Sequence, residues 1–237
     1  MKRSVYSGVR RNPVSYLIPF LLALVVLGLF GYTALAQPNE VWVEPTVSED
    51  VYHYDSLAEA LDVVAPGGTV YIAAGEYVGH ATITKDGLKL KGPGAGTDAR
   101  GRSGPEAVII GSIVVTSDAS EVTIDGLTFQ AFGGDNPYGL GGPYNTALVC
   151  EADSAVIVNN VFRGAESPRG PYTYSSLVNV NATDLTFRRN DVRQVIDVAS
   201  DPNAAYLTVE GWGEIEDNTF AGALGIGVKE GAATSAP

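Results

Sequence analysis

Short apolar runs alternate with polar, glycine-containing turns along most of the chain. From TVYIA at 69–73 onward, these runs are rich in Val, Ile and Thr and are broken by Gly, Pro, Asn and Asp, which is typical of β-strands. One earlier segment, SLAEALDVVA at 56–65, instead has apolar residues at helical spacing: Leu57, Ala60, Leu61 and Val64. Asp55 or Ser56 suits the N-cap of this helix, and Pro66-Gly67-Gly68 ends it. The pattern predicts an all-β domain that begins with one helix.

The strands form a repeat. Each of four aligned segments has a strand, a polar turn, a second strand, a Gly or Asn, and a short third strand: IVVTSDASEVTIDGLTFQA from 113, ALVCEADSAVIVNNVFRGA from 147, SLVNVNATDLTFRRNDVRQ from 176, and AYLTVEGWGEIEDNTFAGA from 205. The anchor positions are Gly126, Asn160, Asn190 and Asn218. Three short strands per repeat predict the coils of a parallel β-solenoid, stacked about 4.8 Å apart.

The anchors have a physical explanation in such a solenoid. Each coil turns a sharp corner at the same angular position, and Asn and Gly tolerate the left-handed backbone that a corner requires. Stacked Asn side chains also hydrogen-bond to one another as a ladder. We therefore expect a structural ladder at the anchors, with Asn159 exposed beside it. The residues expected to stack inside after the anchors are Phe129, Phe162, Val192 and Phe220.

The opening of the domain resembles a known group. The segment DSLAEALDVVAPGGTVYIAAGEYVGHATITKDGLKLKGPGAGTD from 55, followed by AVIIGS from 107, is similar to the N-terminal part of the pectate-lyase-like right-handed parallel β-helix superfamily. With the repeats, the resemblance covers most of residues 55–228. It implies a right-handed parallel β-helix of about five coils with an N-terminal capping helix. The superfamily includes lyases, hydrolases, esterases, phage tailspikes and non-catalytic repeat proteins, so fold alone implies no single activity.

The chain departs from the enzymes of this superfamily at the residues that carry their chemistry. The resemblance to pectate lyases implies clustered acidic Ca²⁺ ligands, but the acids here are scattered: Asp118, Asp125, Asp153, Asp184 and Asp197. Pectin methylesterases share the pattern Gly-x-Tyr-x-Glu, and this chain has Gly79 at the position of that Glu. Their catalytic Asp motifs and the polygalacturonase Asp-Asp pair have no clear counterpart. We predict no catalytic residue, no metal site and no cofactor.

Basic residues gather in the later repeats, namely Arg163, Arg188, Arg189 and Arg193. Arg163 and Arg193 both follow their anchor Asn by three residues, so we expect them on one face. They are candidates to bind an acidic sugar or an acidic partner surface. The alternative is that they only offset nearby acids such as Asp191.

Two long loops are rich in Gly, Pro and Tyr. They read GGDNPYGLGGPYNT at 133–146 and ESPRGPYTYSS at 166–176, and they contain Tyr138, Tyr144, Tyr172 and Tyr174. Because the repeats stack, these loops are expected to emerge side by side. Tyrosine suits sugar stacking and protein contact. The alternative is that the loops pack on the flank of the solenoid and cover it.

Charge and cysteine content narrow the function classes. The 237-residue chain has a formal net charge of −12. Its first 36 residues contain four basic residues and no acids, so the rest has 15 − 4 = 11 basic and 27 acidic residues, or −16. Such a surface repels nucleic acid, and we expect no nucleic-acid partner. The single Cys150 excludes an internal disulfide and a multi-Cys metal site.

The N-terminus carries a membrane signal. No charged residue occurs between Arg11 and Glu40, and Val14 to Ala36 is long enough to span a bilayer. Alternatively, ALA at 34–36 has the small-x-small form of a signal-peptidase site, which would release the protein after Ala36. In both interpretations the basic end stays in the cytoplasm and the β-helix lies outside.

The sequence thus predicts a basic cytoplasmic segment at 1–13, an anchor or signal peptide at 14–36, a connector at 37–54, a β-helix at 55–228 and a tail at 229–237. The function it favours is a membrane-tethered, non-catalytic scaffold outside the cytoplasmic membrane. Such a scaffold would dock on a larger membrane protein complex or on the cell surface. The alternative is a carbohydrate-active β-helix protein, either a polysaccharide lyase or a glycan-binding module.

Overall fold

The computed structural model describes residues 36–46, 52–131, 146–164, 177–193, 207–221 and 226–228. Within them lie the short helix α2 (Leu57–Val63) and one continuous set of sixteen strands. The strands are β1 (Glu40–Val43), β2 (His53–Tyr54), β3 (Thr69–Ile72), β4 (Gly75–Ile83), β5 (Lys89–Lys91), β6 (Ala107–Val115), β7 (Thr123–Asp125), β8 (Thr128–Gln130), β9 (Leu148–Cys150), β10 (Val156–Val158), β11 (Val161–Arg163), β12 (Val178–Arg188), β13 (Asp191–Arg193), β14 (Leu207–Glu216), β15 (Thr219–Ala221) and β16 (Ile226–Val228).

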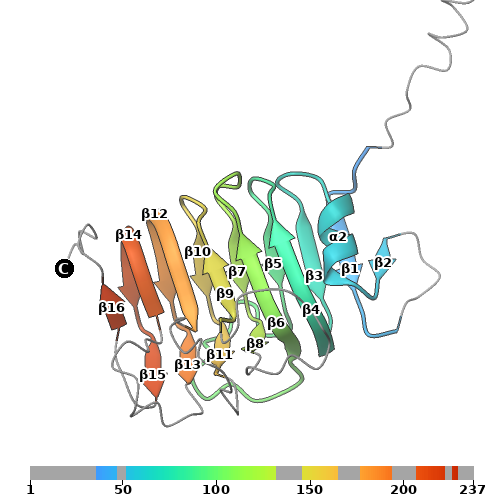
Figure 1. Ribbon diagram of the computed structural model, residues 1–237. Coiled ribbons are helices and arrows are strands. Elements are labelled where there is room, and N and C mark those ends of the chain that lie inside the picture. The colour runs from blue at the N-terminus through green and yellow to red at the C-terminus, as the bar shows by residue number, and fades with distance from the viewer. Residues whose placement is uncertain are drawn as a thin grey trace, which may run out of the picture. The chain divides into compact units, whose positions relative to one another are not determined.

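The strands stack in parallel as a β-solenoid of about five turns, as the repeat predicts. Figure 1 shows them side by side, with α2 beside β1. Face 1 consists of β1, β3, β5, β7, β10 and the second halves of β12 and β14. Face 2 consists of the first halves of β4 and β6, then β8, β11, β13 and β15. Face 3 consists of the second halves of β4 and β6, then β9, the first halves of β12 and β14, and β16.

The core is a column of apolar side chains inside the coils. Phe129 and Phe162 pair in register and stack with ring centroids 4.9 Å apart, and Phe162 also stacks on Phe187 at 6.0 Å. Val192 pairs with Phe162, and Phe220 pairs with Val192. The predicted inner stack is therefore confirmed. Because each coil buries the same positions, core packing fixes the register of every new coil on the last.

Helix α2 packs its apolar side, including Leu57, Ala60 and Leu61, into the core. Its N-cap is Ser56, whose hydroxyl oxygen accepts from the backbone N–H of Glu59 at 3.4 Å. The last turn has no basic residue of its own. Instead, Lys85 Nζ donates to the carbonyl oxygens of Leu61, Asp62 and Val64 at 2.8, 2.7 and 2.8 Å. A residue from the following coil thus satisfies carbonyls that a helix end leaves unpaired.

Part of the predicted connector belongs to the solenoid. Residues 40–43 form β1, which pairs with β3 in face 1 and with β2. The reason is visible in the alternation of EVWV, because Val41 and Val43 are fully buried while Glu40 and Trp42 point outward.

The corner between face 1 and face 2 contains the Asn ladder. Asn160 Oδ1 accepts from the backbone N–H of Leu127 at 2.9 Å, and Asn160 Nδ2 donates to the carbonyl of Ile124 at 2.9 Å. Asn190 Oδ1 in turn accepts from the N–H of Asn160 at 2.9 Å, and Asn218 Oδ1 from that of Asn190 at 2.8 Å. Each amide therefore ties its own coil to the preceding one.

Gly126 does not belong to this ladder, contrary to the sequence alignment. The pairing of Val161 with Thr128 places Leu127 opposite Asn160 and Gly126 opposite Asn159. The left-handed residues occupy this earlier position: Gly126 (φ 76°), Asn159 (φ 58°), Arg189 (φ 54°) and Asp217 (φ 54°). The corner therefore uses two residues in sequence. The first supplies the left-handed backbone, and the second turns its amide inward.

The sequence analysis predicted that Asn159 is exposed, and this prediction is wrong. Only 4% of it is accessible, and its Nδ2 donates to Asp125 Oδ1 at 2.8 Å. The cause is the segment 92–106, which packs over this corner, as the contacts of Arg102 below show. Local sequence could not indicate this, because the covering segment precedes Asn159 by more than 50 residues.

Several predictions lie outside the described residues. These include the anchor or signal peptide at 14–36 except its last residue, the tail at 229–237 and the four tyrosines Tyr138, Tyr144, Tyr172 and Tyr174. Among the described ranges, no helix is long and apolar enough to cross a membrane.

Candidate functional site

A row of polar and basic side chains runs along the outer side of face 2. Gln130 on β8, Arg163 on β11 and Arg193 on β13 pair in register across three successive coils. We call these three residues the basic row. Neighbouring strands are about 4.8 Å apart, so a single extended ligand would meet all three side chains in succession.

Arg193 is held by a buried carboxylate. Its Nε donates to Asp191 Oδ1 at 3.0 Å, and its Nη2 donates to Asp191 Oδ2. Asp191 is 1% exposed, whereas 56% of the Arg193 side chain is accessible. The hydrogen bond from Arg193 and the charge of Asp191 raise the pKa of the guanidinium above its ordinary value. The pair therefore fixes the base of Arg193 and leaves much of its guanidinium facing solvent.

Arg163 is exposed and has no ion pair or side-chain hydrogen bond to any described residue. Beside it, Gln130 Nε2 donates to the carbonyl of Gly164 at 2.9 Å, which holds the amide against the next coil. The two arginines carry +2 and Asp191 carries −1, so this part of face 2 has a local charge of +1. Like charges in register on adjacent strands are unfavourable, so an anion bound between the two guanidinium groups would relieve repulsion.

The other two predicted arginines lie elsewhere. Arg188 points outward from face 1, and its Nε lies 3.7 Å from Asp217 Oδ2 and 4.0 Å from Glu216 Oε2. Arg189 occupies the left-handed corner position, where its carbonyl accepts from the N–H of Ala99 at 3.2 Å. The corner thus separates residues that are adjacent in sequence. The structure joins Arg163 with Arg193 and does not bring Arg188 or Arg189 to the same face.

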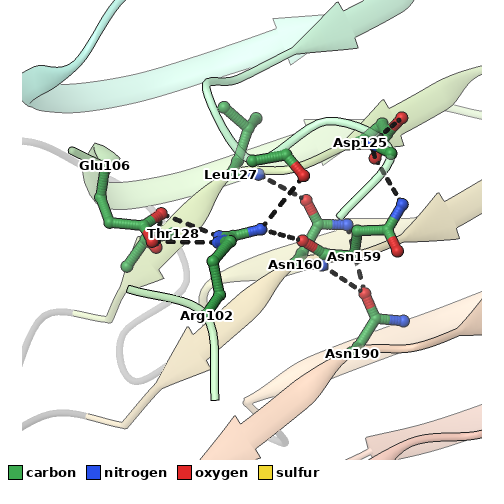
Figure 2. Close-up of polar contacts among 10 residues, drawn as sticks. Arg102, Glu106, Asp125, Leu127, Thr128, Asn159, Asn160 and Asn190 are labelled. Atoms are coloured by element: carbon green, nitrogen blue, oxygen red, sulfur yellow. Dashed lines mark hydrogen bonds and ion pairs between the residues drawn. The ribbon is translucent and has the colours of Figure 1, made fainter. Parts of the chain in front are cut away.

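The segment 92–106 lies over the corner between faces 1 and 2 and is held by Arg102 (Figure 2). Arg102 Nη1 donates to the carbonyl of Asn159 at 2.6 Å, and its Nε and Nη2 donate to the Glu106 carboxylate at 3.0 and 2.8 Å. Glu106 also accepts from the Thr128 hydroxyl at 2.9 Å. Because the Arg102 side chain is only 6% exposed and each of its three guanidinium nitrogens donates a hydrogen bond, we assign it to positioning this segment.

The acids considered as metal ligands take part in turns. Asp125 accepts from the N–H of Gly96, and Asp184 accepts from the Ser154 hydroxyl. Asp153 accepts from the N–H and hydroxyl of Thr183 at 2.9 and 2.6 Å, and these bonds hold its pKa below the ordinary value. No group of three or more His, Cys, Asp or Glu able to hold a metal occurs within the described part of the chain. Asp197 lies outside it.

A small cavity of about 120 Å³ lies beside α2 and is lined in part by Asp55, Tyr77 and His80. His80 Nδ1 accepts from the backbone N–H of Ser112 at 3.2 Å and lies 2.5 Å from the Ser112 hydroxyl. Burial lowers the pKa of His80. Ser112 is fully buried and does not line the cavity, so this Ser–His contact is not accessible to a substrate.

One exposed residue was missed by the sequence analysis. Trp212 on β14 is 49% exposed. Its only sequence signal is the pair of glycines that flank it in GWG, a pattern that places a bulky side chain between two positions without side chains.

Two solved structures are similar to this one, and both are pectin methylesterases. A mutant pectin methylesterase in complex with a hexasaccharide aligns with a TM-score of 0.45 and 13% identity, over 77% of this chain and 66% of that chain. The pectin methylesterase from Aspergillus niger, in a penultimately deglycosylated form, aligns with a TM-score of 0.44 and 16% identity, over 84% of this chain and 69% of that chain. This chain thus spans about two thirds of the length of each. No protein-family model and no curated protein matches the sequence.

The described strands form a parallel β-solenoid of about five turns, which agrees with the fold that the sequence resemblance implies. The prediction of a membrane-tethered, non-catalytic scaffold is corrected and not retained, since both of the similar structures are pectin methylesterases. At these identities the similarity concerns the fold. The argument for carbohydrate binding therefore rests on the residues of face 2.

Proposed function

We propose that this chain is a carbohydrate-active β-helix protein that binds an acidic polysaccharide along face 2. The observation that supports this most directly is the basic row, in which Arg163 and Arg193 pair in register and only Arg193 is bonded to a carboxylate, that of the buried Asp191. The planar fork of an arginine matches a carboxylate in a bidentate way. Uronate residues supply such carboxylates along an extended polymer.

The rest of the row also suits a sugar chain. The Gln130 amide is held by Gly164 and offers its oxygen to a hydroxyl. On the preceding coils the same row continues with Ile110 and then Val78, of which 46% is exposed. These apolar side chains can pack against the C–H faces of pyranose rings, whereas the two arginines would bind the carboxylates.

Binding is favoured here over calcium-dependent cleavage. Such cleavage requires clustered carboxylates beside the base, whereas Asp191 is occupied by Arg193 and the acids described above are bonded in turns. Because the chain is strongly acidic overall, we expect a polyanion to be attracted locally, at this row, and not by the net charge of the protein. We expect the affinity to fall as salt screens the exposed arginines.

We also propose that the protein acts outside the cytoplasmic membrane. The support is the uncharged stretch from Val14 to Ala36 after four basic residues, either as an anchor or as a signal peptide. Helix α2, next to β1, would cap the N-terminal end of the solenoid. An extracytoplasmic position would give the row access to cell-surface polysaccharide.

The test is binding of the purified full-length protein to polygalacturonate by isothermal titration calorimetry at two salt concentrations. Arg163→Gln is the primary variant because Arg163 has no described partner whose loss would disturb the fold. We expect roughly tenfold to a hundredfold weaker binding, as for the loss of a hydrogen bond to a charged group. The matched control is Arg188→Gln on face 1, which is expected to bind as the unaltered protein does.

Arg193→Lys provides a second variant that retains the charge beside Asp191 but loses the planar fork. Weaker binding with an unchanged melting temperature would support carboxylate recognition. The proposal is wrong if Arg163→Gln and Arg193→Lys both bind polygalacturonate with unaltered affinity. Shortening of the polymer during the titration would instead demonstrate cleavage.

A further inference from the structure

Trp212 stands at the turn from face 3 to face 1, away from the basic row. It is the most exposed of the large apolar side chains in the described ranges, at 49%. Both of its neighbours are glycines, Gly211 and Gly213. Because the exposed indole contributes nothing to the core, its face is available for contact with a ligand.

The glycines explain how the indole is presented. A Cβ at Gly211 would lie 2.0 Å from the carbonyl oxygen of Ala182, and one at Gly213 would lie 2.2 Å from that of Leu185. Both backbones therefore pack directly against β12, and Gly211 also has a positive φ of 133°. The register of β12 and β14 shifts between Ala182 and Leu185. The turn thus anchors the chain on both sides of Trp212 while the indole itself stays outside.

Exposed polar residues lie beside Trp212 on its own strand and on the neighbouring one. Across from it in the preceding coil lie Asn181, Thr183 and Asp184, all exposed, and Asn181 pairs with Glu210. Glu214 follows on β14 and is also exposed. An aromatic face packs against the C–H side of a sugar ring, while carboxylate and amide oxygens accept hydrogen bonds from its hydroxyls.

The charge around Trp212 selects the class of sugar. Three carboxylates, those of Asp184, Glu210 and Glu214, lie on this turn and the adjoining strand. They repel an anionic glycan, and they serve as acceptors for hydroxyl groups. We infer that Trp212 and the polar groups beside it form a second binding site that takes a neutral pyranose sugar. This site is independent of the acidic polysaccharide proposed for face 2.

The two tryptophans of the chain make this inference testable by fluorescence. Trp42 is stacked between His53 and Tyr71, with ring centroids 5.5 Å away on each side. A Trp42→Phe variant leaves Trp212 as the only tryptophan. Titration of this full-length variant with cellohexaose, and separately with a galactan hexasaccharide, should give a saturable change in emission for at least one of them.

Binding of the same sugars is also measured by calorimetry on the protein with both tryptophans. We expect Trp212→Ala to weaken it about tenfold or more, as for truncation of an aromatic anchor, and Trp212→Phe to retain most of it. Tyr52→Ala is the matched control, because Tyr52 is 44% exposed on another part of the solenoid. Arg163→Gln should leave neutral-sugar binding unchanged, so failure here is separable from failure of the face 2 proposal.

Three results would overturn the inference. The first is that neither neutral sugar changes the emission of Trp42→Phe or binds the protein with both tryptophans. The second is equal sugar affinity in Trp212→Ala and the unaltered protein. The third is a response of Trp212 to polylysine without any response to sugar, which would assign the turn to a basic protein segment instead.

Discussion

The side-chain oxygen of Asn190 accepts a hydrogen bond from the backbone N–H of Asn160 at 2.9 Å, one coil away. Asn160 repeats this contact toward Leu127 and also donates from its Nδ2 to the carbonyl of Ile124. The amide of one residue therefore satisfies the Leu127 N–H in the preceding coil and adds a hydrogen bond to the Ile124 carbonyl.

Replacing Asn160 with Leu should destabilise the solenoid strongly. The change leaves the Leu127 N–H unsatisfied in the core, at about 1–3 kcal/mol, and removes one hydrogen bond to the Ile124 carbonyl, at about 0.5–1.5 kcal/mol. We expect a total loss of roughly 1.5–4.5 kcal/mol in the free energy of unfolding, measured by urea denaturation. Asn181→Ala, a change of an exposed Asn, is the control. An unaltered unfolding midpoint for Asn160→Leu would show that the ladder does not stabilise the fold.

Two positions with a left-handed backbone predict substitutions with opposite effects on the stability of the protein. Glu121 is exposed at φ 54°, and a non-Gly residue in this conformation costs roughly 1 kcal/mol. Glu121→Gly should therefore stabilise the protein by up to about 1 kcal/mol. Gly126→Ala should destabilise it by more than that, because an added Cβ would lie 1.9 Å from the backbone nitrogen of Ala95. Thermal unfolding of both variants checks the pair, and the same sign of change in both would contradict this account of the left-handed positions.

Lys85 should contribute to stability through the end of α2. It donates to three helix carbonyls, and its partial burial lowers its pKa. Lys85→Met keeps the aliphatic stem but loses these bonds, so we expect a loss of about 1–3 kcal/mol. Lys89→Met, a change on the exposed side of β5, should have little effect. Equal unfolding free energies for the two variants would show that the Lys85 hydrogen bonds to the end of α2 do not stabilise the protein.

His80 should make the protein less stable in acid. Its Nδ1 accepts from the Ser112 N–H, so the neutral ring carries its proton on Nε2, and protonation would place a second donor against Ser112. Burial lowers the folded-state pKa below the ordinary value of 6.5. The unfolded state therefore binds more protons, and stability declines as the pH falls through 6.5 and toward the lower folded pKa.

The measurement is the melting temperature across that pH range. We expect His80→Gln to flatten the part of the pH dependence that begins near 6.5. A curve of the same shape for the variant and the unaltered protein would assign the acid sensitivity to other groups.

By itself the sequence determined the solenoid, its strands from β3 onward, the inner stack of Phe129, Phe162, Val192 and Phe220, and the pairing of Arg163 with Arg193. These follow from a periodic pattern, because each coil buries the same positions and a parallel stack places equivalent residues opposite one another. The tertiary structure decided what depends on contacts without a period. The segment 92–106 buries Asn159, and Lys85 reaches the end of α2. The corner sends Arg188 and Arg193 to different faces, and Gly211 and Gly213 hold Trp212 outside. Each of these features occurs at a single place in the chain and is not repeated from coil to coil, so the periodic pattern of the sequence does not predict it.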